Sequence, residues 1–459
     1  MNKKDIFKKI ILDFQEKKLS GIIPRKNVKL YDIPDDINKI VSLIGIRRCG
    51  KTYILYEKIL KLIEEKIVNE KNIIYINFED DRISPLELND LNDLLESYYE
   101  LYPLKKDETV YIFLDEIQNI SGWEKFIRRI FDTENCRIYI TGSSSKLLSK
   151  EISTSLRGRN LPFEIFPLSF KEFLTFKNYS TGSDINSDLF LYSSKSAAKI
   201  KYLLNEYLNR GGFPEVITYN DDNWRRTIND YIDLVLYKDI VERFNISNTY
   251  LMKYLIKYLL KNISSLISIN KLYNDFKSFG FNISKNTVYE YISYLEDAYV
   301  IFSVPVFSNS FKEQQINPKK IYSVDIAFKK ITDFSFDIGR IYENIVFLEL
   351  RRNFKDIFYV KSENVKTNRT YKNKKYKNKD NYEVDFYIPE NKTLINVCYD
   401  ITEPDTFLRE KGGLLSAMNA LSVNEGYIIN SEEERNIGID GKTIRIIPLW
   451  KWLLYNNRI

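Results

Sequence analysis

Histidine is absent from this chain of 459 residues, and cysteine occurs only three times. Without an imidazole, the chain has no histidine general base, no histidine metal ligand and no Ser-His-Asp triad. Any catalysis must therefore use carboxylates, lysine, arginine or a hard cation. The cysteines, Cys49, Cys136 and Cys398, lie far apart and form no C-x-x-C pair, so the sequence indicates neither a disulfide framework nor a thiolate zinc site. This cysteine usage favours a reducing cytoplasm.

Long apolar runs are missing as well. No apolar stretch reaches the roughly 18 residues that a membrane-spanning helix needs, so we expect no membrane partner. Residues 1–18 alternate lysine with large apolar residues in an amphipathic helical pattern, which differs from that of a signal peptide. The composition, 44% apolar and 29% charged, is ordinary for globular proteins, and the length predicts about three domains. The net charge of +6 permits binding to nucleic acid without requiring it.

A phosphate-binding pattern, G-x-x-x-x-G-K-[ST], occupies residues 45–52. It lies between an apolar run, 40–44, that predicts a buried strand and a segment, 53–65, with helical spacing. Glycines let backbone N–H groups curve around a phosphate, and the N-terminus of the following helix adds positive potential. Lys51 would reach the terminal phosphates of ATP and Thr52 would bind Mg²⁺, whereas a chance match on a glycine turn is the alternative. The residues expected to bind nucleotide are Gly45, Ile46, Arg47, Arg48, Cys49, Gly50, Lys51, Thr52 and Tyr53.

A second apolar run, residues 110–114, ends in the adjacent carboxylates Asp115 and Glu116. On a strand beside the phosphate-binding loop, Asp115 would hold Mg²⁺ together with Thr52, and Glu116 would orient or deprotonate the attacking water. A strand that ended in a solvated acidic turn would look the same. The two patterns together predict a Mg²⁺-dependent ATP site.

Hydroxyl and guanidinium groups follow the next predicted strand, 137–142. Ser143 is a candidate to sense the terminal phosphate or to position water, although serine-rich turns also cap helices. Arg157 and Arg159 could supply a guanidinium to ATP on the same subunit or on a neighbouring one. The second arrangement would require a homo-oligomer. The alternative for both arginines is a surface ion pair. The expected catalytic residues are Glu116, Arg157, Arg159 and Ser143.

Strand patterns recur at the spacing of alternating strands and helices. This alternation predicts an α/β fold, a P-loop NTPase whose parallel sheet is covered on both faces. An additional strand between the phosphate-binding loop and the carboxylate strand is characteristic of P-loop ATPases that use a catalytic glutamate. The five predicted strands are residues 40–44, 73–78, 110–116, 137–142 and 162–167.

Six motifs carry a resemblance to a known family. They are, in order, G-I-R-R-C-G-K-T, Y-I-F-L-D-E-I-Q-N-I-S-G-W-E, I-Y-I-T-G-S-S-S-K-L-L-S, S-L-R-G-R, P-L-S-F-K-E-F-L and R-G-G-F-P-E-V-I. Together they resemble the prokaryotic, largely archaeal, predicted AAA+-superfamily ATPases that carry a winged helix and a C-terminal nuclease-like domain. The resemblance covers nearly the whole chain and implies a P-loop ATPase of the type with a catalytic glutamate. It matches Lys51, Thr52, Asp115 and Glu116 to the nucleotide site, and it implies no substrate.

The middle of the chain is predicted to be helical. Helical spacing occurs over residues 170–176, 197–208 and 230–243, and a glycine-proline stop lies at 211–214. This region resembles an AAA+ lid.

A winged helix is suggested by the segment that follows. Helices at 268–278 and 284–297 surround a turn, and a strand follows at 299–307. The second helix sets Lys285 against three acidic side chains, which is unfavourable for approach to a DNA backbone. Packing against the ATPase is therefore the alternative to DNA binding.

The last region resembles the core of PD-(D/E)xK nucleases, with Glu343 on a helix and Asp385 on a strand. In that core, an aspartate and the acidic residue of (D/E)xK bind metal, and the lysine activates water or stabilises charge. Here the triplet on the next strand reads Asn396-Val397-Cys398, so a metal carboxylate and the lysine are missing. We expect a degenerate nuclease fold retained for binding, unless Glu410 or Lys411 restores activity. The residues of the degenerate site are Glu343, Asp385 and Cys398.

A basic segment, 366–379, lies between these strands and holds seven lysines and arginines, no acid and two tyrosines. The basic side chains could bind the phosphates of a nucleic acid while the tyrosines stack on its bases, or the segment could be a solvated loop. The candidate nucleic-acid contacts are Lys372, Lys374, Lys375 and Lys377.

These patterns predict four domains and three competing functions. The leading hypothesis is a Mg²⁺-dependent ATPase whose C-terminal half binds DNA or a protein partner. A nucleotide-held signalling or binding switch with little turnover is the second hypothesis, and an ATP-gated nuclease is the third. The domains are a P-loop AAA+-like domain at 1–168, a helical lid at 169–247, a winged helix at 248–317 and a nuclease-like domain at 318–459.

Overall fold

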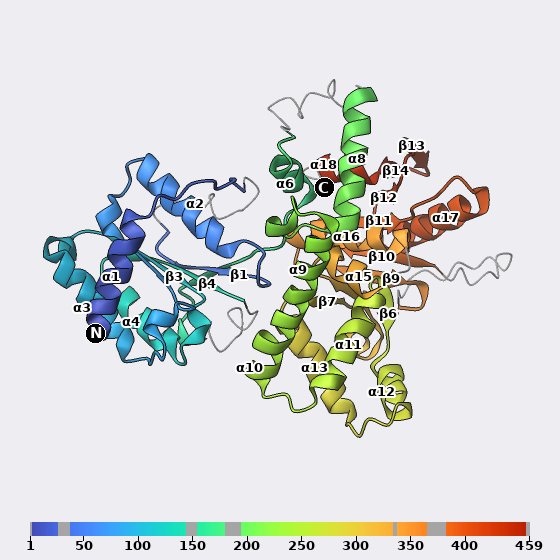
Figure 1. Cartoon of the computed structure of the whole chain (residues 1–459). Helices are drawn as coiled ribbons and strands as arrows, with labels where there is room; N and C mark the ends of the chain where they lie inside the picture. The colour runs from blue at the N-terminus through green and yellow to red at the C-terminus, as the bar shows by residue number, and fades with distance from the viewer. Residues whose placement is uncertain are drawn as a thin grey trace. The chain divides into compact units, whose positions relative to one another are not determined.

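A computed structural model of the chain describes residues 2–25, 37–143, 154–179, 194–333, 337–364 and 382–455. The chain forms two compact units (Figure 1). The first comprises Met1–Pro167 and Asp297–Tyr299, and the second comprises Leu168–Glu296 and Val300–Ile459.

The first unit is built on a five-stranded sheet in the order β2-β3-β4-β1-β5. Every neighbouring pair is parallel, which confirms the predicted α/β fold with a parallel sheet. β4 lies between β1 and β3, so an additional strand separates the strand before the phosphate-binding loop from the strand that ends in Asp115. The strands are β1 (Ile40–Ile44), β2 (Ile73–Asn77), β3 (Val110–Asp115), β4 (Cys136–Gly142) and β5 (Asn160–Glu164).

Apolar runs explain why these segments form central strands. All five residues of β1 are buried, as expected for a parallel sheet that is covered on both faces. The N-terminal helix also belongs to this core, since it buries Phe7, Ile10 and Ile11. The helices of the unit are α1 (Lys3–Glu16), α2 (Lys51–Glu64), α3 (Asp90–Leu101) and α4 (Trp123–Thr133).

The second unit begins with helices. The predicted helix over 230–243 starts earlier, at Asp221, and its last part, Val235–Val241, is a π-helix. The predicted stop is present: Gly211 has a φ of 77°, and a Cβ on Gly212 would lie 2.4 Å from the carbonyl oxygen of Leu168. The helices are α6 (Phe170–Phe176), α8 (Ser194–Arg210), α9 (Asp221–Leu234) and α10 (Glu242–Phe244).

A three-stranded antiparallel sheet follows, in the order β6-β8-β7. The predicted strand at 299–307 is shorter, because pairing with β8 extends only from Ile301 to Val304. The elements are α11 (Thr249–Lys261), β6 (Ser265–Ile267), α12 (Ile269–Ser278), α13 (Lys285–Asp297), β7 (Ile301–Val304), α14 (Phe311–Ile316) and β8 (Lys319–Ser323).

The remainder of the second unit is a mixed six-stranded sheet in the order β13-β14-β12-β11-β10-β9. One face packs on α17 through Leu414, Ala417 and Met418. None of the helices in the described residues is long and apolar enough to cross a membrane. The elements are α15 (Ile326–Thr332), α16 (Ile338–Asn353), β9 (Phe358–Lys361), β10 (Glu383–Ile388), β11 (Thr393–Val397), α17 (Pro404–Leu421), β12 (Glu425–Asn430), β13 (Arg435–Ile439), β14 (Lys442–Pro448) and α18 (Leu449–Tyr455).

Candidate functional site

The loop of residues 45–50 joins β1 to α2 in the first unit. A Cβ atom on Gly45 would lie 2.0 Å from the carbonyl oxygen of Ile165, so only glycine fits this close approach. Gly50 has a left-handed φ of 101° immediately before α2 begins. Backbone geometry thus requires both glycines of the pattern, and the loop leads into a helix N-terminus, where N–H groups favour an anion.

Arg25 holds this loop from outside the motif. Its buried guanidinium donates hydrogen bonds to the carbonyl oxygens of Cys49, at 2.9 Å, and Phe166, at 3.0 Å. Its backbone N–H donates to the carboxylate of Glu57 on α2, at 3.0 Å. Sequence reasoning missed Arg25 because it lies outside every pattern, and no local signal identifies its partners.

Lys51 and Glu116 lie together at the end of this loop. Lys51 is only 4% exposed, and its Nζ lies 3.0 Å from the carbonyl oxygen of Gly45 and 3.5 Å from Glu116 Oε1. Burial acts to raise the pKa of Glu116, but the charges of Lys51 and Arg47 outweigh burial and lower the pKa below its usual value. Glu116 is therefore an ionised carboxylate beside the lysine of the phosphate-binding pattern.

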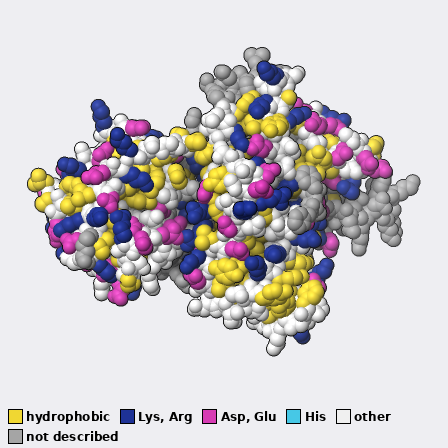
Figure 2. Space-filling view, viewed as in Figure 1, with side chains coloured by type: hydrophobic (Ala, Val, Ile, Leu, Met, Phe, Trp, Pro, Cys, Tyr) yellow, Lys and Arg dark blue, Asp and Glu magenta, His cyan; other side chains and the backbone are white. Residues whose placement is uncertain are grey.

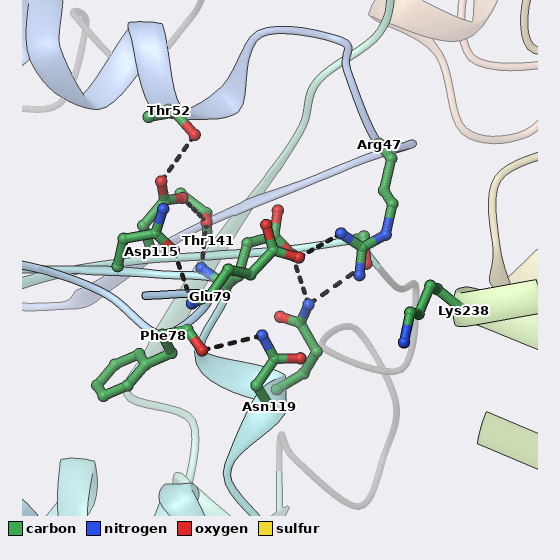
Figure 3. Close-up of polar contacts among 12 residues, drawn as sticks. Arg47, Thr52, Phe78, Glu79, Asp115, Asn119, Thr141 and Lys238 are labelled. Atoms are coloured by element: carbon green, nitrogen blue, oxygen red, sulfur yellow. Dashed lines mark hydrogen bonds and ion pairs between the residues drawn. The ribbon is translucent and has the colours of Figure 1, made fainter. Parts of the chain in front are cut away.

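Asp115 accepts hydrogen bonds from three hydroxyl groups. Thr52 Oγ1 donates to Asp115 Oδ2 at 2.7 Å, and Thr141 donates to Oδ1 (Figure 3). Tyr75 donates to Oδ2 as well, at 2.9 Å. Burial raises the pKa of Asp115. The structure brings together the predicted pair Thr52 and Asp115, and it adds Tyr75 and Thr141, which the sequence analysis did not name.

Gln118 links Glu116 to Ser143. Its Nε2 donates to Glu116 Oε2 and, at 3.3 Å, to Ser143 Oγ. Its other amide atom, Oε1, is buried and accepts no hydrogen bond from the residues that the structure describes. The predicted Ser143 is itself buried. The carboxylate and the serine that were predicted separately therefore share one bridging amide.

Arg47 forms an ion pair with Glu79, which follows β2 (Figure 3). The sequence analysis named Arg47 only as a member of the loop and did not name Glu79. Because Arg47 also lowers the pKa of Glu116, it belongs to the same charged cluster.

The predicted arginines Arg157 and Arg159 follow Leu156, a core residue. Arg159 Nε lies 2.9 Å from Asp132 Oδ1 on α4, and the guanidinium lies 6.0 Å from the ring centre of Phe131. Arg157 is exposed, with a φ of 48°. Arg159 thus forms an ion pair, which was the alternative for both arginines, and a contact with ATP stays a prediction.

The predicted nuclease-like residues lie in the second unit. Glu343 on α16 and Asp385 on β10 both contact the ammonium group of Lys320, which the sequence analysis did not name. Burial raises the pKa of Glu343 to about 7. Cys398 points elsewhere, since its Sγ donates to the carbonyl oxygen of Asp400 at 3.2 Å, and burial raises its pKa to about 11.

Of the other candidates in the C-terminal region, Glu410 is linked to Asp385 through Asn396, and the basic ones lie elsewhere or are not described. Glu410 accepts a hydrogen bond from Asn396 Nδ2 at 2.9 Å, and Lys411 Nζ lies 5.6 Å from the ring centre of Phe407. The candidate nucleic-acid contacts Lys372, Lys374, Lys375 and Lys377 lie outside the described residues.

Comparison with known proteins gives the relatives of this chain. Residues 37–174 match the profile of an AAA domain, and residues 201–330 match that of a domain of unknown function (DUF8612). An uncharacterized protein of Methanocaldococcus jannaschii is 39% identical over 466 aligned residues, which cover 99% of this chain and 96% of that protein. This chain belongs to the same family as that protein, and its residues 37–174 form an AAA domain.

The family extends beyond archaea. An uncharacterized protein of Haemophilus influenzae is 30% identical over 337 residues, which cover 72% of this chain and 79% of that protein. Solved structures include the Aeropyrum pernix ORC1 protein in complex with DNA, with 14% identity, a TM-score of 0.29, and 64% of this chain and 86% of that chain covered. Cdc6p of Pyrobaculum aerophilum has 11% identity, a TM-score of 0.26, and 72% and 96% covered. The family match assigns the first unit to the ATPase-type P-loop proteins.

Proposed function

We propose that this chain is a Mg²⁺-dependent ATPase that binds and hydrolyses ATP at the loop of residues 45–52. One observation carries the proposal: Lys51, Thr52, Asp115 and Glu116 converge where β1 and β3 end. Lys51 Nζ lies 3.5 Å from Glu116 Oε1, and Thr52 Oγ1 lies 2.7 Å from Asp115 Oδ2. Phosphoryl transfer needs a cation-lined phosphate site, a metal ligand set and a residue that positions water, and these four side chains supply all three.

The donor set fits ATP and Mg²⁺. Thr52 and Asp115 present the hydroxyl and carboxylate oxygens that Mg²⁺ prefers. The Lys51 ammonium and the first N–H groups of α2 would bind the phosphates. Bound Mg²⁺ would neutralise negative charge on the phosphates.

Glu116 would act on the attacking water. Its lowered pKa keeps it ionised at neutral pH, which a proton acceptor requires. In the arrangement described, its two oxygens face Lys51 and Gln118. When the Lys51 ammonium binds the phosphates of ATP, it no longer pairs with Glu116. The Gln118 amide, which donates to both Glu116 and Ser143, would then still hold the Glu116 carboxylate in place.

Steady-state hydrolysis by wild type and Glu116→Gln tests this function. We expect Glu116→Gln to retain ATP binding and to lose about 100-fold or more in kcat, because the amide accepts no proton. Lys51→Ala should abolish ATP binding. Glu65→Gln, which changes an exposed glutamate at the end of α2, serves as the control and should hydrolyse ATP normally. Normal hydrolysis by Glu116→Gln would refute the assignment.

A nucleotide-held switch is the second candidate. The observation that favours it is the engagement of Arg159 with Asp132, since a guanidinium held in an ion pair is not available to stabilise the transferred phosphoryl group. In a switch, ATP would stay bound, and a partner would distinguish the ATP-bound chain from the free chain. Tight ATP binding by wild type without turnover, with or without DNA, would select this function.

We further propose that residues 169–247 form a lid, 248–317 a winged helix and 318–459 a degenerate nuclease-like domain, and that this half binds a partner. The order α11, β6, α12, α13, β7 supports the winged helix, although β8, the central strand of the same sheet, lies just past residue 317. The order α16, β9, β10, β11, α17, β12 supports the nuclease-like core. Basic and acidic side chains are interspersed on the face seen in Figure 2, so we base the choice of DNA as partner on the segment 366–379 alone.

A further inference from the structure

Lys320 is a buried cation at the centre of three carboxylates in the second unit. Its side chain is 4% exposed, and its Nζ lies 2.7 Å from Asp385 Oδ1, 3.0 Å from Glu383 Oε1 and 3.2 Å from Glu343 Oε1. An ammonium group has three N–H donors. Two of these donors form hydrogen bonds, to Glu343 and Asp385, and Glu383 adds an ion pair.

Separate elements deliver these side chains. Lys320 lies on β8 of the three-stranded sheet, Glu343 on α16, and Asp385 on β10 of the six-stranded sheet. β10 has a β-bulge against β9 between Val384 and Tyr387, and such bulges re-aim side chains. Because the lysine comes from one sheet and two carboxylates come from the other, the cluster ties the two sheets together.

Two further donors reach the cluster. Asp385 Oδ2 accepts the backbone N–H of Val397 at 2.8 Å, and Glu343 Oε1 accepts the Tyr322 hydroxyl at 2.7 Å. Asn396, which stands at the acidic position of the nuclease triplet, accepts the backbone N–H of Asp385 through Oδ1. Glu343 and Asp385 thus accept hydrogen bonds from other groups besides Lys320.

A divalent cation does not fit this donor set. Mg²⁺ requires near-octahedral oxygen ligands, whereas here the ammonium fills the space between the carboxylates. Nowhere in the described residues do three or more histidine, cysteine, aspartate or glutamate side chains form a group that could hold a metal ion. The residues present therefore disagree with the metal that a nuclease-like fold implies.

We propose that the Lys320 ammonium permanently takes the place of the divalent cation in the C-terminal domain, so that the carboxylate cluster is a metal-independent tie between two sheets and no nuclease centre. Burial acts to lower the pKa of Lys320, but Asp385, Glu343 and Glu383 outweigh burial and raise the pKa well above its usual value. The lysine thus stays charged. Removing it leaves Glu343 and Asp385 without their counter-ion, and on this inference a divalent cation can then take the vacated place.

Mn²⁺ binding to the full chain tests the inference. All variants carry Asp115→Asn, which removes the carboxylate proposed to bind metal in the first unit, and free Mn²⁺ is measured by electron paramagnetic resonance. We expect Lys320→Met to bind one additional Mn²⁺ per chain, at least about tenfold more tightly than the background chain, and to gain thermal stability with Mn²⁺. Adding Glu343→Gln should remove both gains.

A matched control is available in Lys329→Met. Lys329 is also buried, but its ammonium pairs with the single carboxylate of Asp333 at 2.9 Å, so its removal should create no Mn²⁺ site. A folded Lys320→Met chain that binds no more Mn²⁺ than the background would overturn the inference. If Lys320→Met does not fold, the background chain is compared with and without Glu343→Gln. Identical Mn²⁺ binding is then expected, and a loss in the Glu343→Gln chain would show that metal binds beside the lysine.

Discussion

Tyr75 is a residue whose hydroxyl positions another side chain. It donates to Asp115 at 2.9 Å, and Tyr56 donates to it in turn at 3.2 Å. Its ring stacks on Phe14 of α1, with ring centres 4.4 Å apart. A carboxylate held in this way needs little further ordering to bind a metal, so Tyr75 contributes to Mg²⁺ affinity without touching nucleotide.

Tyr75→Phe should therefore raise the Mg²⁺ concentration needed for half-maximal ATP hydrolysis by about tenfold, with a smaller effect on kcat at saturating Mg²⁺. The variant should also lose about 1 kcal/mol of stability, because Asp115 keeps its bonds to Thr52 and Thr141. Titration of the ATPase rate with Mg²⁺ measures the first effect. Tyr99→Phe is the control, since that hydroxyl also donates to a carboxylate, Glu134. Equal Mg²⁺ curves for both variants would contradict the positioning role.

At the residue scale, motifs predicted part of the site. Lys51, Thr52, Asp115 and Glu116 were found because each occupies a fixed place in a short pattern. Tyr75 has no such pattern, since a tyrosine in an apolar strand is ordinary core composition. Its role depends on the register of β2 beside β3, which pairs Tyr75 with Phe113 and Asn77 with Asp115.

At the scale of elements, Asp325 joins α15 to the turn that ends α8. Its two carboxylate oxygens accept the backbone N–H groups of Gly212 and Ala327, each at 2.8 Å. Burial raises the pKa of Asp325 to about 6 from 3.8, although these hydrogen bonds and the charge of Arg352 act in the opposite direction. The folded state therefore binds this proton more tightly than the unfolded state does.

The sign of the resulting pH dependence follows from linkage. Below pH 3.8 both states are protonated, and between 3.8 and about 6 only the folded state keeps the proton. The free energy of unfolding should thus fall by about 3 kcal/mol as pH rises through this window and should change no further above it.

Asp325→Asn should lack this pH dependence. At pH 4 it should be less stable than wild type by about 1–3 kcal/mol, since the amide has only one acceptor oxygen for two N–H groups, and this deficit should shrink as pH rises toward 7. Urea unfolding of both chains between pH 4 and 7 measures the difference between their free energies of unfolding. The contributions of other titrating groups cancel in this difference. A difference that does not vary with pH would contradict the raised pKa.

Element prediction succeeded where spacing was regular and failed at boundaries. The five strands of the first unit were all predicted, but β5 begins at Asn160 and ends at Glu164, earlier than the predicted 162–167. Pairing with β1 decides this, since Ile40 pairs with Asn160 and Ile44 with Glu164. A strand ends where its neighbour ends, and the neighbour is remote in sequence.

At the scale of the whole molecule, the net charge bears on whether the partner is DNA. The net charge of +6 is small for this length, so DNA binding would depend on local concentration of lysine. We expect replacement of Lys372, Lys374, Lys375 and Lys377 by glutamine to weaken duplex binding. The slope of log affinity against log salt should become shallower by up to about 3.6, because each phosphate contact contributes about 0.9.

Fluorescence anisotropy of labelled duplex between low and moderate salt measures this slope. A control chain in which Lys9, Lys18, Lys66 and Lys106 are replaced by glutamine removes the same charge from exposed positions of the first unit. If both chains show the same change, the effect is one of net charge, and the segment 366–379 is no specific contact.

By itself, the sequence determined the α/β class, the phosphate-binding loop, the carboxylate pair, and the helix with Glu343 followed by the strands with Asp385 and Asn396, because these depend on local periodicity and on short motifs. Only the tertiary structure decided that Arg25 holds the loop, that Gln118 bridges Glu116 and Ser143, and that Lys320 fills the carboxylate cluster of the second unit. Lys320 and Asp385 lie on different sheets and far apart in sequence, so no local pattern marks them as partners. Packing of the two sheets buries Lys320 and partly buries Asp385, and a buried charged group is stable only beside an opposite charge.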